Sequence, residues 1–478
     1  MESSWKETAP AFGGLRVSKS VSILAFFALA VALGVSLPAP TYLKYVHFLL
    51  IALAGVMGLV LVQRRSILPL CFLIATAVFV PFSVVLNGAT RLDSAIPLVS
   101  VLLVALIIET HANQQVTITI PPRIVVPLFL FLATASLSLI VGQFPWFSTH
   151  GAPLSAQLAG LAIFLLSGAA FLLFAIRLKD RGHIRTITWV FLIAGSVTTL
   201  FQVFPVIDDW LALVLGVASI TEPNRIGSLF WTWLIAMAAS QAFLNDRLRL
   251  ASRAGLILLV ALVLYNRLIT YGGWTSGWLP GVIALGVILL LRFPRLTICL
   301  ALLALPLVLL STGIFDSFWH TEGYSFSTRV EAWRVLAEVL SRSLLIGLGP
   351  ANYYYYTSLF PILGWYVTFS SHNNYVDLIA QTGLIGFVLF WWFMGEMGFL
   401  ILRVRNRAVP GFDRAFATGV LAGLLASLAA CMLGDWLIPF VYNVGLAGFR
   451  SSVICWIFLG SLVALARMQR ADPPAPVN

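Results

Sequence analysis

The sequence predicts an all-α integral membrane protein, a bundle of about fourteen transmembrane helices with one large, partly helical loop outside the membrane. Of its 478 residues, 60% are hydrophobic and only 10% are charged, whereas soluble domains carry about 25% charged residues. The mean hydropathy is +0.97. The apolar runs are about twenty residues long and lack an alternation of period two, which favours spanning helices over the strands of a barrel.

Long apolar runs set the order of the predicted spans along the chain. The spans are 20–37, 43–62, 66–86, 92–109, 124–142, 156–176, 184–206, 227–244, 255–270, 275–291, 296–313, 375–402, 414–433 and 449–466. The longest polar stretch between them, residues 314–373, is the predicted external loop. The cysteines all fall inside apolar runs with no histidine nearby, so the sequence predicts neither a disulfide framework nor a zinc site.

The distribution of basic residues predicts the orientation of the bundle. Segments on one side hold 21 of the 29 Lys and Arg residues, and basic residues accumulate in cytoplasmic loops. Both termini are therefore expected in the cytoplasm and the large loop outside, in the periplasm or extracellular space. The same bias explains the net charge of +11, so membrane lipids are expected partners and nucleic acid is not. The first span also has the pattern of a signal sequence, and its cleavage would not change the orientation.

This orientation divides the chain into five parts. They are a cytoplasmic N-terminus (1–19), a transmembrane bundle (20–313), the external loop (314–373), the last helices of the bundle (374–466) and a cytoplasmic tail (467–478). Residues 207–226 and 435–450 are two further polar outer segments. Together with the large loop they are expected to line one cavity.

The external loop is predicted to contain a helix that begins at Thr328. Thr328 and Glu331 have the spacing of a capping box, and apolar residues follow on one face: Val330, Trp333, Leu336, Ala337 and Leu340. Arg329 then lies in the first turn, where free N–H groups and the positive end of the helix dipole favour an anion. A guanidinium there suits phosphate oxygens. The alternative is that Arg329 pairs with an acid or a lipid headgroup.

His372 directly precedes the span that is predicted from Tyr375. A helix N-terminus and a nearby arginine both disfavour a charged imidazole, so His372 is expected to be neutral near pH 7 and able to act as a general base. The alternative is an interfacial histidine that is hydrogen-bonded to Ser370 or Asn374. Asn373 and Asn374 either cap the following helix or orient the histidine.

Other polar and aromatic residues in this region have two interpretations each. Tyr353 begins a run of four tyrosines that can stack on sugars, although such a run is also typical of an aromatic belt at the membrane interface. Gln381 is expected to bond to a neighbouring helix, and Gly383 and Gly386 to permit close helix approach. No metal-binding or cofactor-binding motif is found, so neither a metal nor a cofactor is expected.

Four motifs of this region occur together in a known family. They are Ser327-Thr328-Arg329-x3-Trp333, Gly347-x-Gly349-Pro350, His372-Asn373-x-Tyr375 and Gly383-Leu384-Ile385-Gly386. Over about residues 324–390 the sequence resembles the O-antigen ligase/polymerase family. The resemblance implies a polytopic, GT-C-like glycosyltransferase of the bacterial inner membrane. Such an enzyme moves a glycan from undecaprenyl diphosphate onto an acceptor hydroxyl of a glycan or lipid, without a nucleotide sugar.

The resemblance also implies roles for individual residues. By position, His372 is the catalytic histidine and Arg329 an arginine that binds the diphosphate. Arg225, in Asn224-Arg225-Ile226-Gly227-Ser228, resembles a second essential arginine of the family. The candidate substrate-binding residues are Asn373, Asn374, Trp333 and Tyr353. Gln381 stands where many relatives have a glutamate. The implied reaction is independent of metal and inverts the anomeric centre.

Three alternatives are weighed against a ligase. A polymerase of the same family would need the same residues. A lipid-linked oligosaccharide flippase commonly has internal repeats and charges at mid-membrane, and the sequence shows neither. Another large class of lipid-sugar glycosyltransferases uses acidic residues in the first outer loop, which here spans residues 38–42 and holds none.

Overall fold

The computed structural model is helical over the residues that it describes, apart from one short hairpin of two strands. The described residues are 67–79, 83–86, 90–93, 95–112, 120–207, 209, 227–272, 274–299, 302–303 and 328–471. In chain order the elements are α3 (Leu68–Phe79), β1 (Ser83–Leu86), β2 (Thr90–Asp93), α4 (Ala95–Ala112), α5 (Pro122–Val141), α6 (Leu154–Arg177), α7 (Arg181–Val203), α9 (Ser228–Leu244), α10 (Leu250–Tyr265), the π-helix η3 (Asn266–Thr270), α11 (Thr275–Arg292), α14 (Tyr353–Tyr356), η4 (Thr357–Leu359), α15 (Asn374–Arg407), α16 (Phe412–Leu433), η5 (Leu446–Gly448) and α17 (Phe449–Ala471).

Among the described residues, 8 helices are long and apolar enough to cross a membrane. They are α5, α6, α7, α11, α15 and α16, together with α10 extended by η3 and α17 extended by η5. Three shorter apolar helices are α3, α4 and α9. The chain is therefore a multi-pass helical membrane protein, as the composition predicts. The predicted spans 20–37 and 43–62, and most of 296–313, lie outside the described residues, so the total of fourteen stays a prediction.

The helix α17 lies in the core of the bundle, where its whole span is buried within the protein. Phe458 of α17 stacks on Trp233 of α9 with ring centroids 5.3 Å apart. A Cβ atom at Gly460 would lie 2.2 Å from the carbonyl oxygen of Phe171 in α6. Only glycine permits this approach, since any other residue would place a Cβ atom against the carbonyl. Close van der Waals packing of this kind is what holds helices together in a membrane.

The hairpin of β1 and β2 takes residues that the sequence pattern assigned to two spans. Val84 pairs with Leu92 in an antiparallel register, so the predicted spans 66–86 and 92–109 each extend too far toward one another. A short run of apolar, β-branched residues fits a strand as well as a helix, which explains the error. Nearby, Arg450 is buried and donates to two carbonyls at the end of α3.

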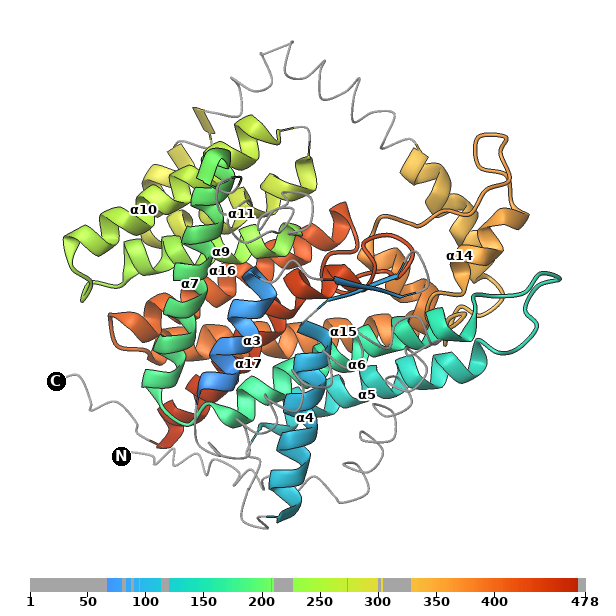
Figure 1. Cartoon of the computed structure of the whole chain (residues 1–478), viewed down its shortest axis with the longest axis horizontal. Coiled ribbons are helices and arrows are strands. Elements are labelled where there is room, and N and C mark those ends of the chain that lie inside the picture. Colours follow the sequence, from blue (N-terminus) through green and yellow to red (C-terminus); the bar gives the residue numbers. More distant parts are fainter. Residues whose placement is uncertain are drawn as a thin grey trace, which may run out of the picture.

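The helices α5 and α6 lie alongside α15, and residues 328–373 gather at the end of these helices where α15 begins (Figure 1). Asn352 ties residues 328–373, called the external segment here because the sequence predicts that they lie outside the membrane, to the connection between α5 and α6. Its Nδ2 donates to the Gly142 carbonyl at 3.0 Å, and the Ala152 N–H donates to its Oδ1 at 2.9 Å. The external segment is therefore fixed on α5 and α6 as well as on α15.

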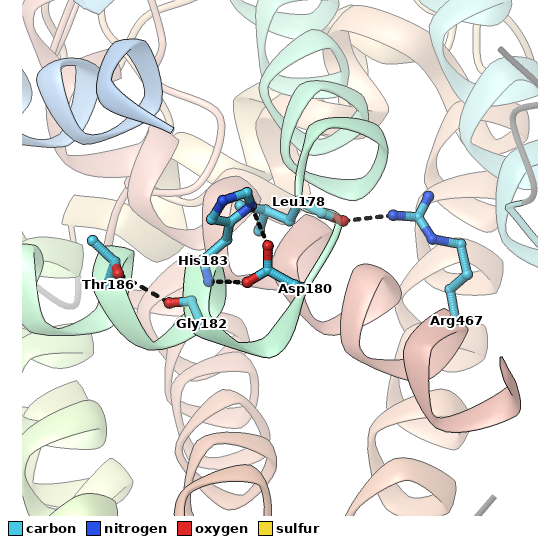
Figure 2. Close-up of polar contacts among 6 residues, drawn as sticks. All are labelled: Leu178, Asp180, Gly182, His183, Thr186 and Arg467. Atoms are coloured by element: carbon cyan, nitrogen blue, oxygen red, sulfur yellow. Dashed lines mark hydrogen bonds and ion pairs between the residues drawn. The ribbon is translucent and has the colours of Figure 1, made fainter. Parts of the chain in front are cut away.

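The turn between α6 and α7 lies near the C-terminal end of α17 (Figure 2). Asp180 caps α7 there, because its carboxylate accepts the His183 backbone N–H at 2.8 Å. Arg467 of α17 donates to the Leu178 carbonyl. Two of the basic segments that the sequence assigns to the cytoplasmic side thus meet in space, and the side of the membrane on which they lie stays a prediction.

Candidate active site

The helix α15 is broken near its N-terminal end, at Gly383. This residue has φ 70° and ψ −176°, which is far from helical geometry. A Cβ atom here would lie 2.1 Å from the Leu345 carbonyl oxygen. Glycine is therefore required both for the backbone conformation and for the close approach of another segment. The sequence predicted close approach at Gly383, but the partner is the external segment, and the helix does not continue through this residue.

The external segment supplies hydrogen bonds that the break would otherwise leave unmade. The Leu348 N–H donates to the Ala380 carbonyl at 2.9 Å. On the other side of the break, the carbonyls of Leu344 and Leu345 accept the N–H groups of the next two residues after Gly383, at 2.9 Å and 3.1 Å. Backbone groups at helix ends need such partners when they are buried. The break in α15 and the external segment therefore depend on each other for their backbone hydrogen bonds.

Gln381 lies inside this junction and is buried. Its Oε1 accepts the Ala351 N–H at 3.3 Å, and Ser138 of α5 donates to its backbone carbonyl. The expected bond from its side chain to a neighbouring helix is therefore wrong: the partner is the loop that follows Gly349. An amide serves there as an acceptor without adding a charge.

Residues 328–340 form a helix, but its buried face differs from the predicted one. The buried residues are Ala332, Val335, Leu336, Val339 and Leu340. Val330 is 44% exposed, and Ala337 is also exposed. The buried face of the helix is therefore rotated relative to the face that Val330 and Ala337 were predicted to share. Thr328 is already helical, so the capping residue lies outside the described part of the chain. Glu331 and Arg334 pair at 3.9 Å, as their spacing predicts.

Trp333 connects this helix to the residues that hold His372. Its indole N–H donates to the Ser371 carbonyl at 3.1 Å. Arg329 lies one turn earlier on the same helix and is half-buried. The sequence predicted that Arg329 and His372 act on one ligand, and this contact brings their two segments together.

His372 is exposed and has a strained backbone, with φ 49°. Its Nδ1 lies 3.1 Å from Asn443 Nδ2. The expected alternative, a bond to Ser370 or Asn374, is not what the structure shows. Although solvent reaches the residue, protein atoms surround enough of the ring for desolvation to lower the pKa of His372, and the positive charge of Arg329 lowers it further. The imidazole is therefore neutral near pH 7.

A buried network holds the backbone on either side of His372. Asn373 caps α15 by accepting the Tyr375 N–H at 2.9 Å. The Ser371 hydroxyl donates to Asp377 Oδ1 at 2.7 Å, and Tyr353 Oη donates to the same oxygen. Such a fully packed network can keep a residue in an unfavourable backbone conformation.

Three of the four candidate substrate-binding residues are buried: Asn373, which caps α15, and Tyr353 and Asn374. Tyr353 is fully buried, and its ring stacks on Phe440 at 4.7 Å, which leaves no ring face for a sugar. Asn374 is also buried, and its amide binds the backbone of Leu437 and Ile438. The structure therefore gives both residues a supporting position, whereas Trp333 is partly exposed.

Arg225 lies outside the described residues, but the helix that follows it is described. A Cβ atom at Gly227 would lie 2.3 Å from Ser451 Oγ and 3.4 Å from the Trp436 ring. Trp436 adjoins Asp435, whose Oδ1 accepts a hydrogen bond from Asn443. The start of α9 is thus close to the loop that contacts His372.

Sequence reasoning missed the roles of Asn443 and Asp435. Both belong to the connection between α16 and α17, which the sequence predicted near the site only as a polar outer segment. Asp435 is 1% exposed, and its Oδ2 accepts the Phe440 N–H at 2.7 Å. A polar residue that lies 71 positions from the histidine carries no local signal of that contact.

The geometry agrees with what a comparison of sequences finds. Residues 234–391 match the O-antigen ligase family. This part of the chain is similar to an O-antigen ligase domain. No curated protein gives a significant match to the chain.

The matched range includes Arg329, Trp333 and His372, and it ends inside α15 just past the break at Gly383. Arg225 and Asn443 lie outside the matched range. The protein is thus a multi-pass membrane protein that is similar, over about a third of its chain, to the O-antigen ligase family.

Proposed function

We propose that the protein transfers a glycan from undecaprenyl diphosphate to an acceptor hydroxyl, with His372 as the general base. Arg225 and Arg329 bind the diphosphate. The reaction takes place at the outer surface of the bacterial inner membrane, with both termini in the cytoplasm. The acceptor is a lipid or another glycan, and attachment of a finished chain, as by a ligase, is the favoured form.

One observation carries the proposal. His372 and Arg329 come from two segments that Trp333 joins, and within the described residues no carboxylate pairs with either of them. A cation that has no anionic partner within the described residues is suited to bind an anion from outside the chain. A neutral imidazole next to it is suited to accept a proton at pH 7.

The chemistry follows from these positions. The acceptor oxygen attacks the anomeric carbon and loses its proton to His372, while the bond from that carbon to the diphosphate oxygen breaks. The diphosphate leaves with the bonding electron pair, and the guanidinium groups of Arg329 and Arg225 stabilise its growing charge. The imidazolium of His372 then returns its proton to solvent. A single displacement inverts the anomeric configuration.

The test is transfer by the purified protein in lipid vesicles. The donor is lipid-linked glycan extracted from cells that lack the protein, and the acceptor is the lipid fraction of the same cells. We expect transfer to continue in EDTA, because arginine side chains neutralise the diphosphate, and we expect an inverted linkage in the product. Loss of transfer in EDTA, or a retained configuration, contradicts this mechanism.

Two other functions are separated by the fate of the glycan. In cells without the protein, long unattached chains indicate a ligase, and single repeat units indicate a polymerase that uses the same residues. A flippase would move the donor between the leaflets of vesicles and form no glycosidic bond. The arrangement around His372 favours bond formation, because a carrier needs no neutral imidazole beside an arginine.

A further inference from the structure

The contact between His372 and the connection between α16 and α17 involves three side chains in a row. Asn443 Nδ2 lies 3.1 Å from His372 Nδ1, and the same nitrogen donates to Asp435 Oδ1. Asp435 is buried, whereas Asn443 and His372 are exposed. One amide group therefore stands between a buried carboxyl group and the imidazole.

The charge of Asp435 decides which way this amide faces. An ionised carboxylate only accepts hydrogen bonds, so Asn443 must turn its NH2 group toward Asp435. The second N–H of that group then points to His372 Nδ1, which has to be an acceptor. The ring proton is consequently on Nε2. In this state His372 offers a substrate an N–H donor and has no lone pair free to take a proton.

The converse holds when Asp435 carries a proton. Its O–H then donates to the oxygen of Asn443, after the amide has turned over. The same oxygen accepts a hydrogen bond from His372 Nδ1–H. The ring proton is now on Nδ1, and Nε2 has a free lone pair. Only this state provides the base that glycan transfer needs.

We propose that Asn443 and Asp435 are positioning residues that set the tautomer of His372, so that transfer requires a neutral Asp435. The inference rests on the proposed role of His372 as the base. The proton of the acceptor hydroxyl moves to Nε2, while Nδ1–H stays hydrogen-bonded to Asn443. The imidazolium that forms is stabilised by this bond and gives its proton back to solvent.

Burial favours the neutral form of Asp435. Desolvation raises the pKa of Asp435 above its ordinary value, although several hydrogen bonds to the carboxylate oppose this. The titratable groups that face Asp435 are Asp377 of α15, Tyr353 of α14 and Cys431 of α16, and Arg329 faces His372. None of the groups that face Asp435 is a cation, so within the described residues no positive charge near it opposes its protonation.

The proposal predicts a bell-shaped dependence of the transfer rate on pH. At low pH the rate falls because His372 becomes charged. At high pH it falls by about tenfold per pH unit because Asp435 loses the proton that the base form requires. The two apparent pKa values belong to the coupled pair rather than to one residue each.

The first experiment measures transfer between pH 5 and pH 9 with the vesicles and lipid-linked donor described above. Asp435→Asn places an amide N–H where the carboxyl proton would be, so the high-pH fall should disappear and the rate should stay level up to pH 9. Asn443→Ala should also remove that fall, with a rate about tenfold lower because the ring is no longer oriented. Asp413→Asn, at the other end of the bundle, is the matched control and should keep the bell shape.

The second experiment reads the tautomer without measuring activity. The ring nitrogens of ¹⁵N-histidine-labelled protein are observed by NMR at pH 8, and the His372 signals are those that vanish in His372→Ala. We expect a proton on Nε2 in the parent protein and on Nδ1 in Asp435→Asn. The signals of His183, which lies beside Asp180, should not change between the two proteins.

The outcomes separate this inference from the proposed function. If the parent protein transfers glycan and Asp435→Asn retains the high-pH fall, the inference is wrong and the proposed function stands. A proton on Nδ1 in both proteins overturns the inference as well. If the parent protein transfers no glycan under any condition, the proposed function fails, and the NMR measurement still decides the tautomer. Asn443→Ala, which alters an exposed side chain, covers the case in which Asp435→Asn does not fold.

Discussion

At both ends of the bundle a histidine lies close to an aspartate, but the contacts differ. His183 Nδ1 lies 3.2 Å from Asp180 Oδ2 (Figure 2), whereas His372 Nδ1 reaches Asp435 only through Asn443. At His183 the carboxylate lies directly against the ring nitrogen. An amide in between keeps the ring oriented and leaves it available for another partner.

The arginines at the two ends differ in the same way. Arg181 lies 3.4 Å from Asp413, while Arg329 has no carboxylate partner among the described residues. The buried acids at this end are bonded to neutral donors instead: hydroxyl groups bind Asp377, and an amide binds Asp435. Charges at one end of the bundle therefore hold helices together. At the other end, the proposed diphosphate site would use a charge that no carboxylate neutralises within the described residues.

The strongest test of this comparison replaces the two histidines. His372→Ala should lower the rate of glycan transfer by about 10²–10⁴-fold, because it removes the general base. His183→Ala should leave the rate within about twofold, since surface contacts of this kind contribute little. Transfer in vesicles and the amount of folded protein are measured for both variants. Equal losses in the two variants would show that the ends do not differ in function.

The next test replaces one arginine at a time in the helix of residues 328–340. Arg329→Gln should lower the transfer rate by about 10²-fold, because a donor to the leaving group is lost. Arg334→Gln, which alters an exposed residue paired with Glu331, should have little effect.

Arg329→Gln should also change the pH profile of transfer. The positive charge of Arg329 lowers the pKa of His372, so its removal raises that pKa. His372 must be neutral to act, and the low-pH fall in rate should therefore move to higher pH. A profile that keeps its low-pH fall unmoved would mean that the two side chains do not interact in solution.

A third test compares the two halves of α15. Gly383→Ala forces a Cβ atom to within 2.1 Å of a carbonyl oxygen, at φ 70°, and should cost about 2–6 kcal/mol of stability. Gly395→Ala introduces a Cβ atom that meets nothing within 4 Å and should stabilise the helix by up to about 1 kcal/mol. The thermal unfolding midpoint in detergent measures both. Similar midpoints for the two variants would argue against the break.

The smallest expected effect concerns the contact between the helix of residues 328–340 and Ser371. Trp333→Phe keeps an aromatic ring but removes the indole N–H, so it should lower transfer by about 3–10-fold, which corresponds to one hydrogen bond. Trp365→Phe is the control, because Trp365 is 73% exposed. A loss as large as that of His372→Ala would mean that Trp333 contacts the substrate directly.

The sequence was sufficient for the class of fold and for two members of the candidate site. The length and hydropathy of the apolar runs predict helical spans, because the thickness of the membrane sets the length of a span and its apolar interior sets the hydropathy. Arg329 and His372 were proposed because each stands beside a predicted helix start, where charge and protonation can be reasoned from local structure, and their roles stay predictions. Their proximity in space depends on Trp333 and Ser371, which no local pattern indicates.

The remaining parts of the site depend on tertiary contacts. Asn443 and Asp435 were missed because a polar outer loop has no periodicity from which a partner can be predicted. The burial of Tyr353 was missed because a helix of four residues is too short to show a buried face. Gly383 was expected to lie within a helix, since a glycine that permits close packing and a glycine that breaks a helix have the same sequence signature.

The break at Gly383 also defines where this protein can be cut and joined. The carbonyls of Leu344 and Leu345 accept the N–H groups of Leu384 and Ile385, so the external segment is hydrogen-bonded to the first two residues of α15 beyond Gly383. A chimera that exchanges this segment with that of a relative should place its junction after Ile385 rather than at His372. A junction at His372 would take the carbonyls at positions 344 and 345 from one protein and their N–H partners in α15 from the other.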